Sequence, residues 1–225
     1  MTIMAVLFDL DETLFDRTTS LRHFLADQIG RHSTLQNVDN KAYIDRFLRL
    51  DQRGRVSKST VYRELLLAMS IDDHSAASAL FHDYEDNFWR FARAFPGIDE
   101  LFEQLGELGV RTGIVTNGQT HIQLRSLAAL NLDQVVDAFL ISESEGARKP
   151  DPEIFERAAH RLNANTNECI FVGDTPVADI VGSQRCGMRG VWFPNGAVWP
   201  SDVSATPDAE IASLAEIPSL VRKWR

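Results

Sequence analysis

Short apolar runs alternate with amphipathic helical patterns along most of the 225-residue chain. The runs are rich in β-branched and aromatic residues and too short for helices, which is typical of buried strands. We predict strands at Met4–Phe8, Thr112–Val115, Phe139–Ile141, Cys169–Val172 and Gly190–Phe193. Apolar residues at three- and four-residue steps predict helices at Ile98–Leu108, Gln119–Leu130, Pro152–Leu162 and Val177–Cys186. This alternation predicts an α/β fold with a parallel sheet covered by helices.

The stretch from Arg17 to Arg93 departs from this alternation. It has no convincing strand pattern, and its apolar residues form four helical stripes. The stripes are Leu21/Phe24/Leu25/Ile29, Ile44/Phe47/Leu48, Val61/Leu65/Leu66/Met69 and Leu80/Tyr84/Phe88. We therefore predict an inserted all-helical domain at residues 17–93, within a core formed by residues 1–16 and 94–225. The Pro96-Gly97 step is a candidate hinge, and residues 194–207 are predicted to be loop before a short terminal helix.

Charge and cysteine content narrow the classes of function. The chain has 32 acidic and 23 basic residues, a net charge of −9, which argues against binding a nucleic-acid polymer or an anionic membrane surface. Cys169 and Cys186 have neither metal-ligand nor redox spacing, so we expect them to be small buried residues in a reducing compartment. We find no signal sequence and no membrane-spanning stretch, and therefore expect a cytoplasmic protein.

Polar residues follow four of the predicted strands. Ligands in open α/β sheets bind beyond the carboxyl ends of the strands, so these positions are candidates for chemistry. The four segments are Asp9-Leu10-Asp11-Glu12-Thr13, Thr116-Asn117-Gly118, Arg148-Lys149 and Gly173-Asp174-Thr175. Considered singly, each has an ordinary interpretation as a solvated turn or, for the lysine, a surface side chain.

Three aspartates in these segments favour a metal site over ordinary turns. Asp9 and Asp11 are two residues apart on an extended segment, so both can face one cleft. Asp174, at another strand end, adds a third carboxylate. Three converging carboxylates would repel one another unless a hard divalent cation lay among them, and sparse carboxylate ligation suits Mg²⁺.

The four segments together resemble the motifs of a known family. In chain order, DLDET, VTNG, RKPDP and GDTPVAD are similar to the four motifs of the haloacid dehalogenase superfamily, and the match extends from Met4 to Gly187. The resemblance implies a Rossmann-like three-layer core. The helical insert between the first and second motifs resembles that superfamily's cap domain of the helical-bundle type, called C1.

The resemblance also implies roles for the acidic residues. Asp9 would be the nucleophile, and Asp11 the general acid and base. The implied Mg²⁺ ligands are Asp9, the backbone carbonyl of Asp11, and Asp174. Asp179, the second acid of the last motif, would support the site by positioning metal-bound water or a lysine.

The remaining motif residues would bind the phosphoryl group. The resemblance implies that Thr116 and the backbone of Asn117 contact its oxygens, while Lys149 pairs with both Asp9 and the phosphate. An attacking carboxylate and a phosphate ester carry like charge, so a metal ion and a lysine are the groups this chemistry needs.

The implied activity is that of an Mg²⁺-dependent phosphatase acting on a small phosphorylated metabolite, of the nucleotide or sugar phosphate class, through an aspartyl-phosphate. A phosphomutase would share all four motifs. Dehalogenases of the superfamily lack the second aspartate of the first motif, which is present here as Asp11. A catalytically idle binding protein is a further alternative. We expect a monomer or a homodimer, with substrate choice determined by the insert.

Overall fold

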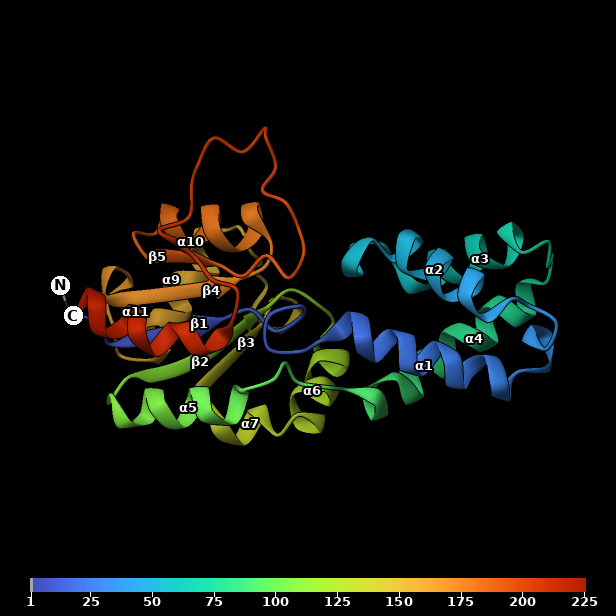
Figure 1. Cartoon of the computed structure of the whole chain (residues 1–225), viewed down its shortest axis with the longest axis horizontal. Coiled ribbons are helices and arrows are strands. Elements are labelled where there is room, and N and C mark those ends of the chain that lie inside the picture. The colour runs from blue at the N-terminus through green and yellow to red at the C-terminus, as the bar shows by residue number, and fades with distance from the viewer. Residues whose placement is uncertain (1) are drawn as a thin grey trace. The chain divides into compact units, whose positions relative to one another are not determined.

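The computed structural model describes residues 2–225, which form two compact units (Figure 1). One unit comprises residues 2–16 and 94–225, and the other comprises residues 17–93. These are the positions at which the hydrophobic pattern changes from alternating strands and helices to helices alone.

The first unit contains a six-stranded parallel sheet in the order β3-β2-β1-β4-β5-β6. The strands are β1 (Ala5–Phe8), β2 (Arg111–Thr116), β3 (Ala138–Ile141), β4 (Cys169–Gly173), β5 (Arg189–Trp192) and β6 (Ala209–Glu210). Phe8 is in register with Ile114 on one side and with Val172 on the other. This register brings the carboxyl ends of β1, β2 and β4 to one edge of the sheet. The predicted α/β class with a parallel sheet is confirmed.

Helices cover both faces of the sheet. They are α5 (Ile98–Glu107), α6 (Thr120–Ala129), α7 (Leu132–Val135), α8 (Ser142–Glu145), α9 (Pro152–Arg161), α10 (Gly182–Arg185) and α11 (Ile217–Trp224). Because side chains alternate along a strand, Leu7 joins a core cluster that includes Phe155 of α9, while Phe8 contacts Phe102 of α5. Phe155 also packs edge-on against Phe171 of β4, with ring centroids 5.0 Å apart. The central strands are therefore buried on both sides, as their uninterrupted apolar sequence requires.

The structure differs from the prediction in short elements. The predicted helix Val177–Cys186 is a π-helical turn at Pro176–Val181 followed by α10. β6 was missed because a two-residue strand has no measurable periodicity. It is fixed by tertiary contacts: Asp208 accepts a hydrogen bond from the Gly190 backbone at 2.9 Å and donates one to the Gly190 carbonyl at 2.8 Å. The two cysteines are unpaired, Cys169 fully buried and Cys186 half-buried.

The second unit is all-helical, as predicted. Its helices are α1 (Arg17–Arg31), α2 (Asn40–Asp51), α3 (Lys58–Ala68) and α4 (His74–Asn87), followed by a 3₁₀ turn at Phe88–Phe91. Each of the last three helices begins after a residue whose side chain accepts a hydrogen bond from an otherwise unpaired backbone N–H. These capping residues are Asp39, Ser57 and Asp73.

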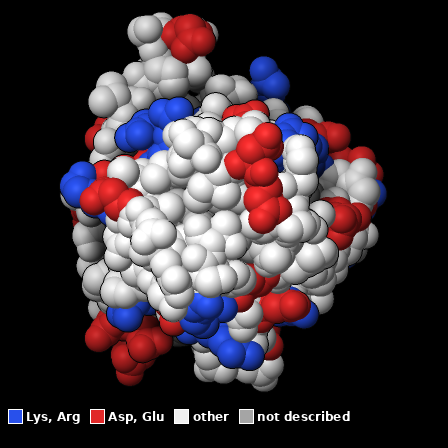
Figure 2. Space-filling view, turned by 90° about the vertical axis from the view of Figure 1, so that its right-hand side faces the viewer, with Lys and Arg blue, Asp and Glu red and all other residues white. Residues whose placement is uncertain are grey.

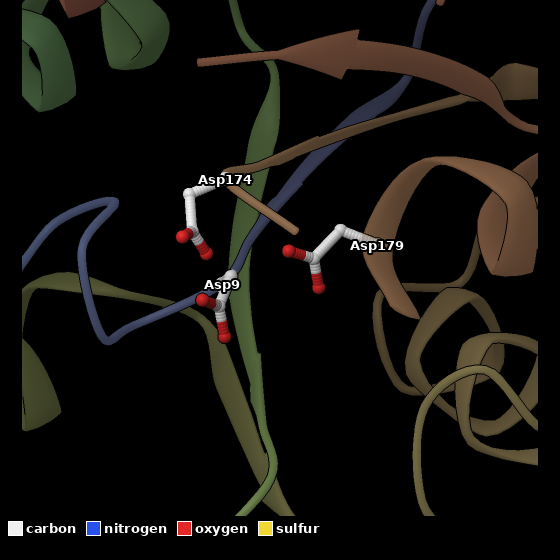
Figure 3. Close-up of side chains that lie close together, drawn as sticks. All are labelled: Asp9, Asp174 and Asp179. Atoms are coloured by element: carbon white, nitrogen blue, oxygen red, sulfur yellow. The ribbon is translucent and has the colours of Figure 1, made fainter. Parts of the chain in front are cut away.

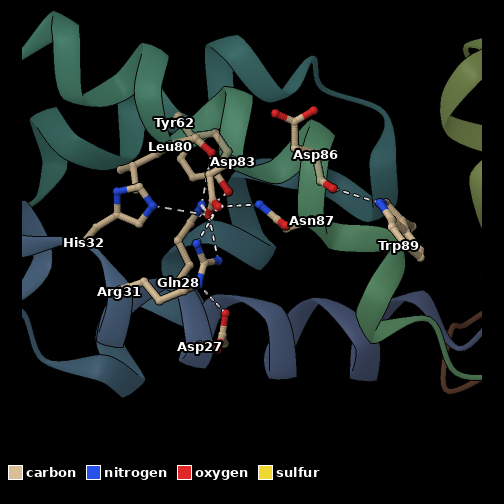
Figure 4. Close-up of polar contacts among 10 residues, drawn as sticks. All are labelled: Asp27, Gln28, Arg31, His32, Tyr62, Leu80, Asp83, Asp86, Asn87 and Trp89. Atoms are coloured by element: carbon tan, nitrogen blue, oxygen red, sulfur yellow. Dashed lines mark hydrogen bonds and ion pairs between the residues drawn. The ribbon is translucent and has the colours of Figure 1, made fainter.

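A network of polar side chains joins α1 to α4 (Figure 4). Arg31 of α1 donates to both oxygens of Asp83 at 2.5 and 2.9 Å, and Gln28 donates to Asp83 at 2.9 Å. Gln28 in turn accepts a hydrogen bond from the Tyr62 hydroxyl of α3 at 3.0 Å. Gln28 and Asp83 thus link side chains of α1, α3 and α4.

A second network is more deeply buried. Asp51, at the end of α2, accepts a hydrogen bond from Arg17 at 2.7 Å and pairs with Lys58 at 2.5 Å. Its oxygen also accepts the backbone N–H of Gly54 at 2.8 Å. Burial raises the pKa of Asp51, but the charges of Arg17 and Lys58 outweigh burial and lower the pKa overall. Asp51 is therefore an ionised carboxylate holding two cations.

Figure 2 shows one face of the molecule, on which Lys and Arg side chains form separate groups beside acidic ones, around an uncharged centre. Among the described residues on this face, no continuous basic surface is visible. None of the described helices combines the length and the apolar character required to cross a lipid bilayer.

Removal of the Asp51 charge should destabilise the helical unit. Asp51→Asn removes the negative charge that pairs with both Arg17 and Lys58, so we expect the free energy of unfolding to fall by about 3–5 kcal/mol. Urea denaturation followed by circular dichroism measures the change. Asp45→Asn, which removes the partner of the exposed Lys41, is the matched control and should have little effect. Equal stabilities of the two variants would contradict the assignment.

Candidate active site

Three aspartates form a buried cluster at the carboxyl edge of the sheet. Carboxylate oxygens of Asp9, Asp174 and Asp179 all lie within 4.8 Å of one another (Figure 3). The residues are only 7%, 6% and 1% exposed, respectively. Asp9 follows β1, Asp174 follows β4, and Asp179 lies in the π-helical turn after β4.

The backbone explains how these residues meet. The Asp9 N–H donates to the Val172 carbonyl at 2.9 Å, which aligns the end of β1 with the end of β4. Asp179 is turned back toward the strand because its side chain accepts the Thr175 N–H at 2.8 Å. Gly173 is required beneath it, since a Cβ at this position would lie 2.4 Å from the Asp179 side chain.

Lys149 lies within the acidic cluster. Its ammonium is 2.5 Å from Asp9 Oδ1 and 2.7 Å from Asp179 Oδ1, and the residue is 4% exposed. Its backbone is held by the Asn117 side chain, which donates to the Lys149 carbonyl and accepts from the Lys149 N–H, both at 2.9 Å. The loop after β2 therefore fixes the position of the lysine that reaches the end of β1.

The electrostatics of the cluster are unbalanced, because one ammonium faces three carboxylates. Burial raises the pKa of Asp9 well above its ordinary value; the Lys149 charge opposes this, and the charges of Asp179 and Asp174 add to it. Burial lowers the pKa of Lys149, but Asp179 and Asp9 outweigh burial and raise it overall. Lys149 is therefore a permanent cation. The remaining negative charge is buried and costly unless another cation compensates it.

This donor set fits a divalent cation. Carboxylate oxygens are hard ligands, and Asp9, Asp174 and Asp179 present them from three directions at close range. The structure thus brings together two of the predicted metal ligands, Asp9 and Asp174. It also places Asp179, predicted to have a supporting role, among the carboxylates themselves.

The Asp11 side chain lies outside this acidic cluster, and its predicted part in metal binding was assigned to its backbone carbonyl. Its Oδ2 accepts a hydrogen bond from Gln123 Nε2 at 2.8 Å. Gln123 also donates to Thr116 Oγ1 at 2.6 Å. Asp11 and Thr116, which the sequence placed at two different strand ends, are therefore joined by one side chain of α6.

Gln123 was not predicted from the sequence. The available signal was a glutamine on the buried side of the helix after VTNG, where Ser126 and Leu127 are also buried. A polar side chain in that position needs a hydrogen-bond partner inside the protein. The identity of the partner depends on the packing of α6 against the strand ends, which periodicity does not give.

Further contacts support the loops around the cluster. The Trp192 indole N–H of β5 donates to the Asp174 carbonyl at 2.9 Å, and the Thr175 hydroxyl donates to Asp174 Oδ1 at 3.0 Å. Glu12, which is buried and adopts a positive φ of 62°, accepts a hydrogen bond from Asn195 at 2.9 Å. The long loop after β5 thus fixes the segment that carries Asp9 and Asp11.

Comparisons with known proteins agree with this arrangement. Residues 3–187 match the family model described as haloacid dehalogenase-like hydrolase. The chain is 30% identical to a glyceraldehyde 3-phosphate phosphatase of Pyrococcus abyssi, over 86% of this chain and 82% of the relative. It is 31% identical to a ribulose-1,5-bisphosphate 5-phosphatase of Halopiger xanaduensis, over 96% and 98% of the two chains.

A solved structure extends the likeness over the whole chain. The 2-haloacid dehalogenase of Pseudomonas syringae is similar with a TM-score of 0.65 and 28% identity, over 100% of both chains. The family model covers all four motif segments, which lie between Asp9 and Asp179. The chain belongs to the haloacid dehalogenase-like hydrolase family.

Proposed function

We propose that this protein hydrolyses a small phosphomonoester, with Mg²⁺ as cofactor and Asp9 as nucleophile. The observation that carries the proposal is the position of the Asp9 carboxylate, which is buried, 2.5 Å from the Lys149 ammonium and within 4.8 Å of two further carboxylates. Carboxylates around a hard cation beside a fixed ammonium form a site suited to a phosphate dianion. The two phosphatase relatives support this choice of substrate.

Asp9, Asp174 and Asp179 are the residues that would hold the metal, together with the backbone carbonyl of Asp11. When bound, Mg²⁺ neutralises charge on the phosphoryl oxygens and allows a carboxylate to approach them. Lys149 supplies a second positive charge to the same oxygens, since its ammonium already contacts Asp9. The Thr116 hydroxyl and the Asn117 backbone N–H donate hydrogen bonds to the phosphoryl group.

The reaction proceeds in two steps. An Asp9 oxygen attacks phosphorus, the bond to the leaving alcohol breaks, and Asp11 donates a proton to that alcohol. Asp11, now a carboxylate, then takes a proton from water, whose oxygen attacks the phosphorus of the aspartyl-phosphate. The bond to Asp9 breaks, inorganic phosphate leaves, and both aspartates return to their starting states.

The leaving group is proposed to be a small sugar. The relatives named above act, by their names, on a triose phosphate and on a pentose bisphosphate. The core residues would contact only the phosphoryl group, so selection of the alcohol is assigned to the helical unit acting as a cap. Nucleoside monophosphates are the second substrate class.

A second candidate function is dehalogenation, favoured by the likeness to the Pseudomonas syringae enzyme. Attack on carbon requires neither a metal nor a proton donor for the leaving halide. The buried acidic cluster and the hydrogen-bonded Asp11 therefore favour phosphate chemistry. Chloride release from 2-chloropropionate in EDTA would support the second candidate. Dependence of turnover on a sugar bisphosphate activator would instead indicate a phosphomutase.

Substitution of the nucleophile should abolish turnover. With p-nitrophenyl phosphate and Mg²⁺, we expect Asp9→Asn to lower kcat by at least about 1,000-fold, because the amide cannot form the phosphoryl ester. Asp133→Asn, at a half-buried position of α7 outside the acidic cluster, is the matched control and should retain activity. Asp9→Asn with the activity of the unmodified protein would refute the mechanism and favour an idle binding protein.

Mg²⁺ should stabilise the folded protein through the acidic cluster. Because the pKa of Asp9 is raised, its ionised form is disfavoured in the folded chain, and the cost appears as the pH rises above the ordinary carboxyl range. In EDTA at neutral pH, Asp9→Asn should therefore unfold at a higher temperature than the unmodified protein. Millimolar Mg²⁺ should raise the Tm of the unmodified protein more than that of the variant.

Thermal unfolding with and without EDTA makes both comparisons. A Tm of the unmodified protein that does not respond to Mg²⁺ would contradict metal binding at this cluster. This measurement needs no substrate, so it tests the metal site separately from the reaction.

The substrate class can be resolved by phosphate release from a panel of triose, pentose and hexose phosphates and nucleoside monophosphates. We expect the largest kcat/KM among the sugar phosphates. A nucleotide at the top of the panel would overturn the proposed leaving group but leave the phosphatase assignment intact.

A further inference from the structure

One amide side chain connects two residues of the proposed reaction. Gln123 is 4% exposed, and its Nε2 donates to Asp11 Oδ2 at 2.8 Å and to Thr116 Oγ1 at 2.6 Å. An amide nitrogen carries two protons, so each acceptor receives one. Both contacts are made by the same nitrogen, which fixes the orientation of the amide.

We propose that Gln123 is a positioning residue, which orients the proton-transferring carboxyl of Asp11 and the phosphate-binding hydroxyl of Thr116 at the same time. The inference rests on the proposed function, since it assigns a role within that reaction. Gln123 itself is assigned no contact with substrate and acts through its two acceptors.

The hydrogen bonds orient the groups that the proposed reaction uses. Because Oδ2 of Asp11 accepts from Gln123, rotation of the carboxyl that transfers the proton is restricted. Because Thr116 Oγ1 also accepts from Gln123, its own proton is directed away from the amide, toward the proposed phosphoryl group. A single donor group therefore sets the direction of proton delivery and the direction of phosphate binding.

The backbone near Gln123 leaves room for its side chain. Gly118 lies in the loop between β2 and α6, and a Cβ at this position would lie 2.9 Å from Gln123 Cγ and 3.0 Å from its Cδ. Glycine leaves the space through which Gln123 reaches the strand ends. The Gln123 backbone N–H donates to the Gln119 carbonyl at 3.0 Å, in the first turn of α6, so the side chain starts from a fixed position.

A comparison of two substrates isolates the orientation of Asp11. p-Nitrophenolate leaves without a proton, whereas the alkoxide of an alkyl phosphate such as glycerol phosphate requires one. Gln123→Met keeps the length of the side chain and removes both donors. Gln123→Glu keeps its shape and places a second carboxylate against Asp11. Measuring kcat/KM for both substrates reports the step in which the alcohol leaves.

We expect kcat/KM for the alkyl phosphate to fall by about 10- to 100-fold more than kcat/KM for p-nitrophenyl phosphate, because only the alkyl phosphate depends on an oriented acid. The inhibition constant of inorganic phosphate should rise by about 2- to 10-fold, which reports the loss of Thr116 orientation. Ser126→Ala, which removes the hydrogen bond from the Ser126 hydroxyl to the Ile122 carbonyl within α6, is the control. It should change neither the substrate preference nor the inhibition constant.

Equal losses on the two substrates, or no loss on either, would overturn the inference and leave Gln123 a structural residue. Circular dichroism and Tm identify a variant that fails to fold, and the second Gln123 substitution then decides the outcome. Absence of turnover by the unmodified protein would instead refute the proposed function, so the two failures are distinguishable.

Discussion

Burial of more negative than positive charge at the carboxyl edge of the sheet is the constraint on which the site depends. Asp9, Asp174 and Asp179 share the single ammonium of Lys149, with contacts of 2.5 Å and 2.7 Å to two of them. Such a group of charges is expensive to hold in place. The parallel sheet holds these charges in place, because Phe8 is in register with Val172 and the ends of β1 and β4 therefore lie side by side.

The loops that follow the strands are held by polar contacts from distant parts of the chain. Asn117 fixes the backbone of Lys149, Trp192 donates to the Asp174 carbonyl, and Asn195 binds Glu12. Each contact links a loop to a neighbouring strand end, so none of the charged residues depends only on its own loop. The arrangement keeps like charges close together without any of them turning out to solvent.

The sequence predicted those parts of the molecule whose signal is local. Five of the six strands were found because they are short runs rich in apolar residues, and the positions of Asp9, Lys149 and Asp174 followed from the rule for parallel strand ends. Two features depend on tertiary geometry instead. Asp179 reaches the cluster through a π-helical turn, and Gln123 meets Asp11 only because α6 packs over two strand ends. The motif resemblance pointed to Asp179 as a supporting residue but not to its place among the carboxylates, and no motif or periodicity pointed to Gln123.

Lys149 and Asp11 lie in different environments, which separates charge compensation from the proposed proton transfer. The carboxylates around Lys149 raise its pKa, so the ammonium keeps its proton throughout the neutral range and cannot serve as the acid of the proposed reaction. Asp11 lies outside the acidic cluster and receives its hydrogen bond from a neutral amide. The Gln123 amide is uncharged, so its contact orients the Asp11 carboxyl without placing a further charge beside it. The carboxyl proposed to gain and lose a proton is therefore not one of those that pair with Lys149.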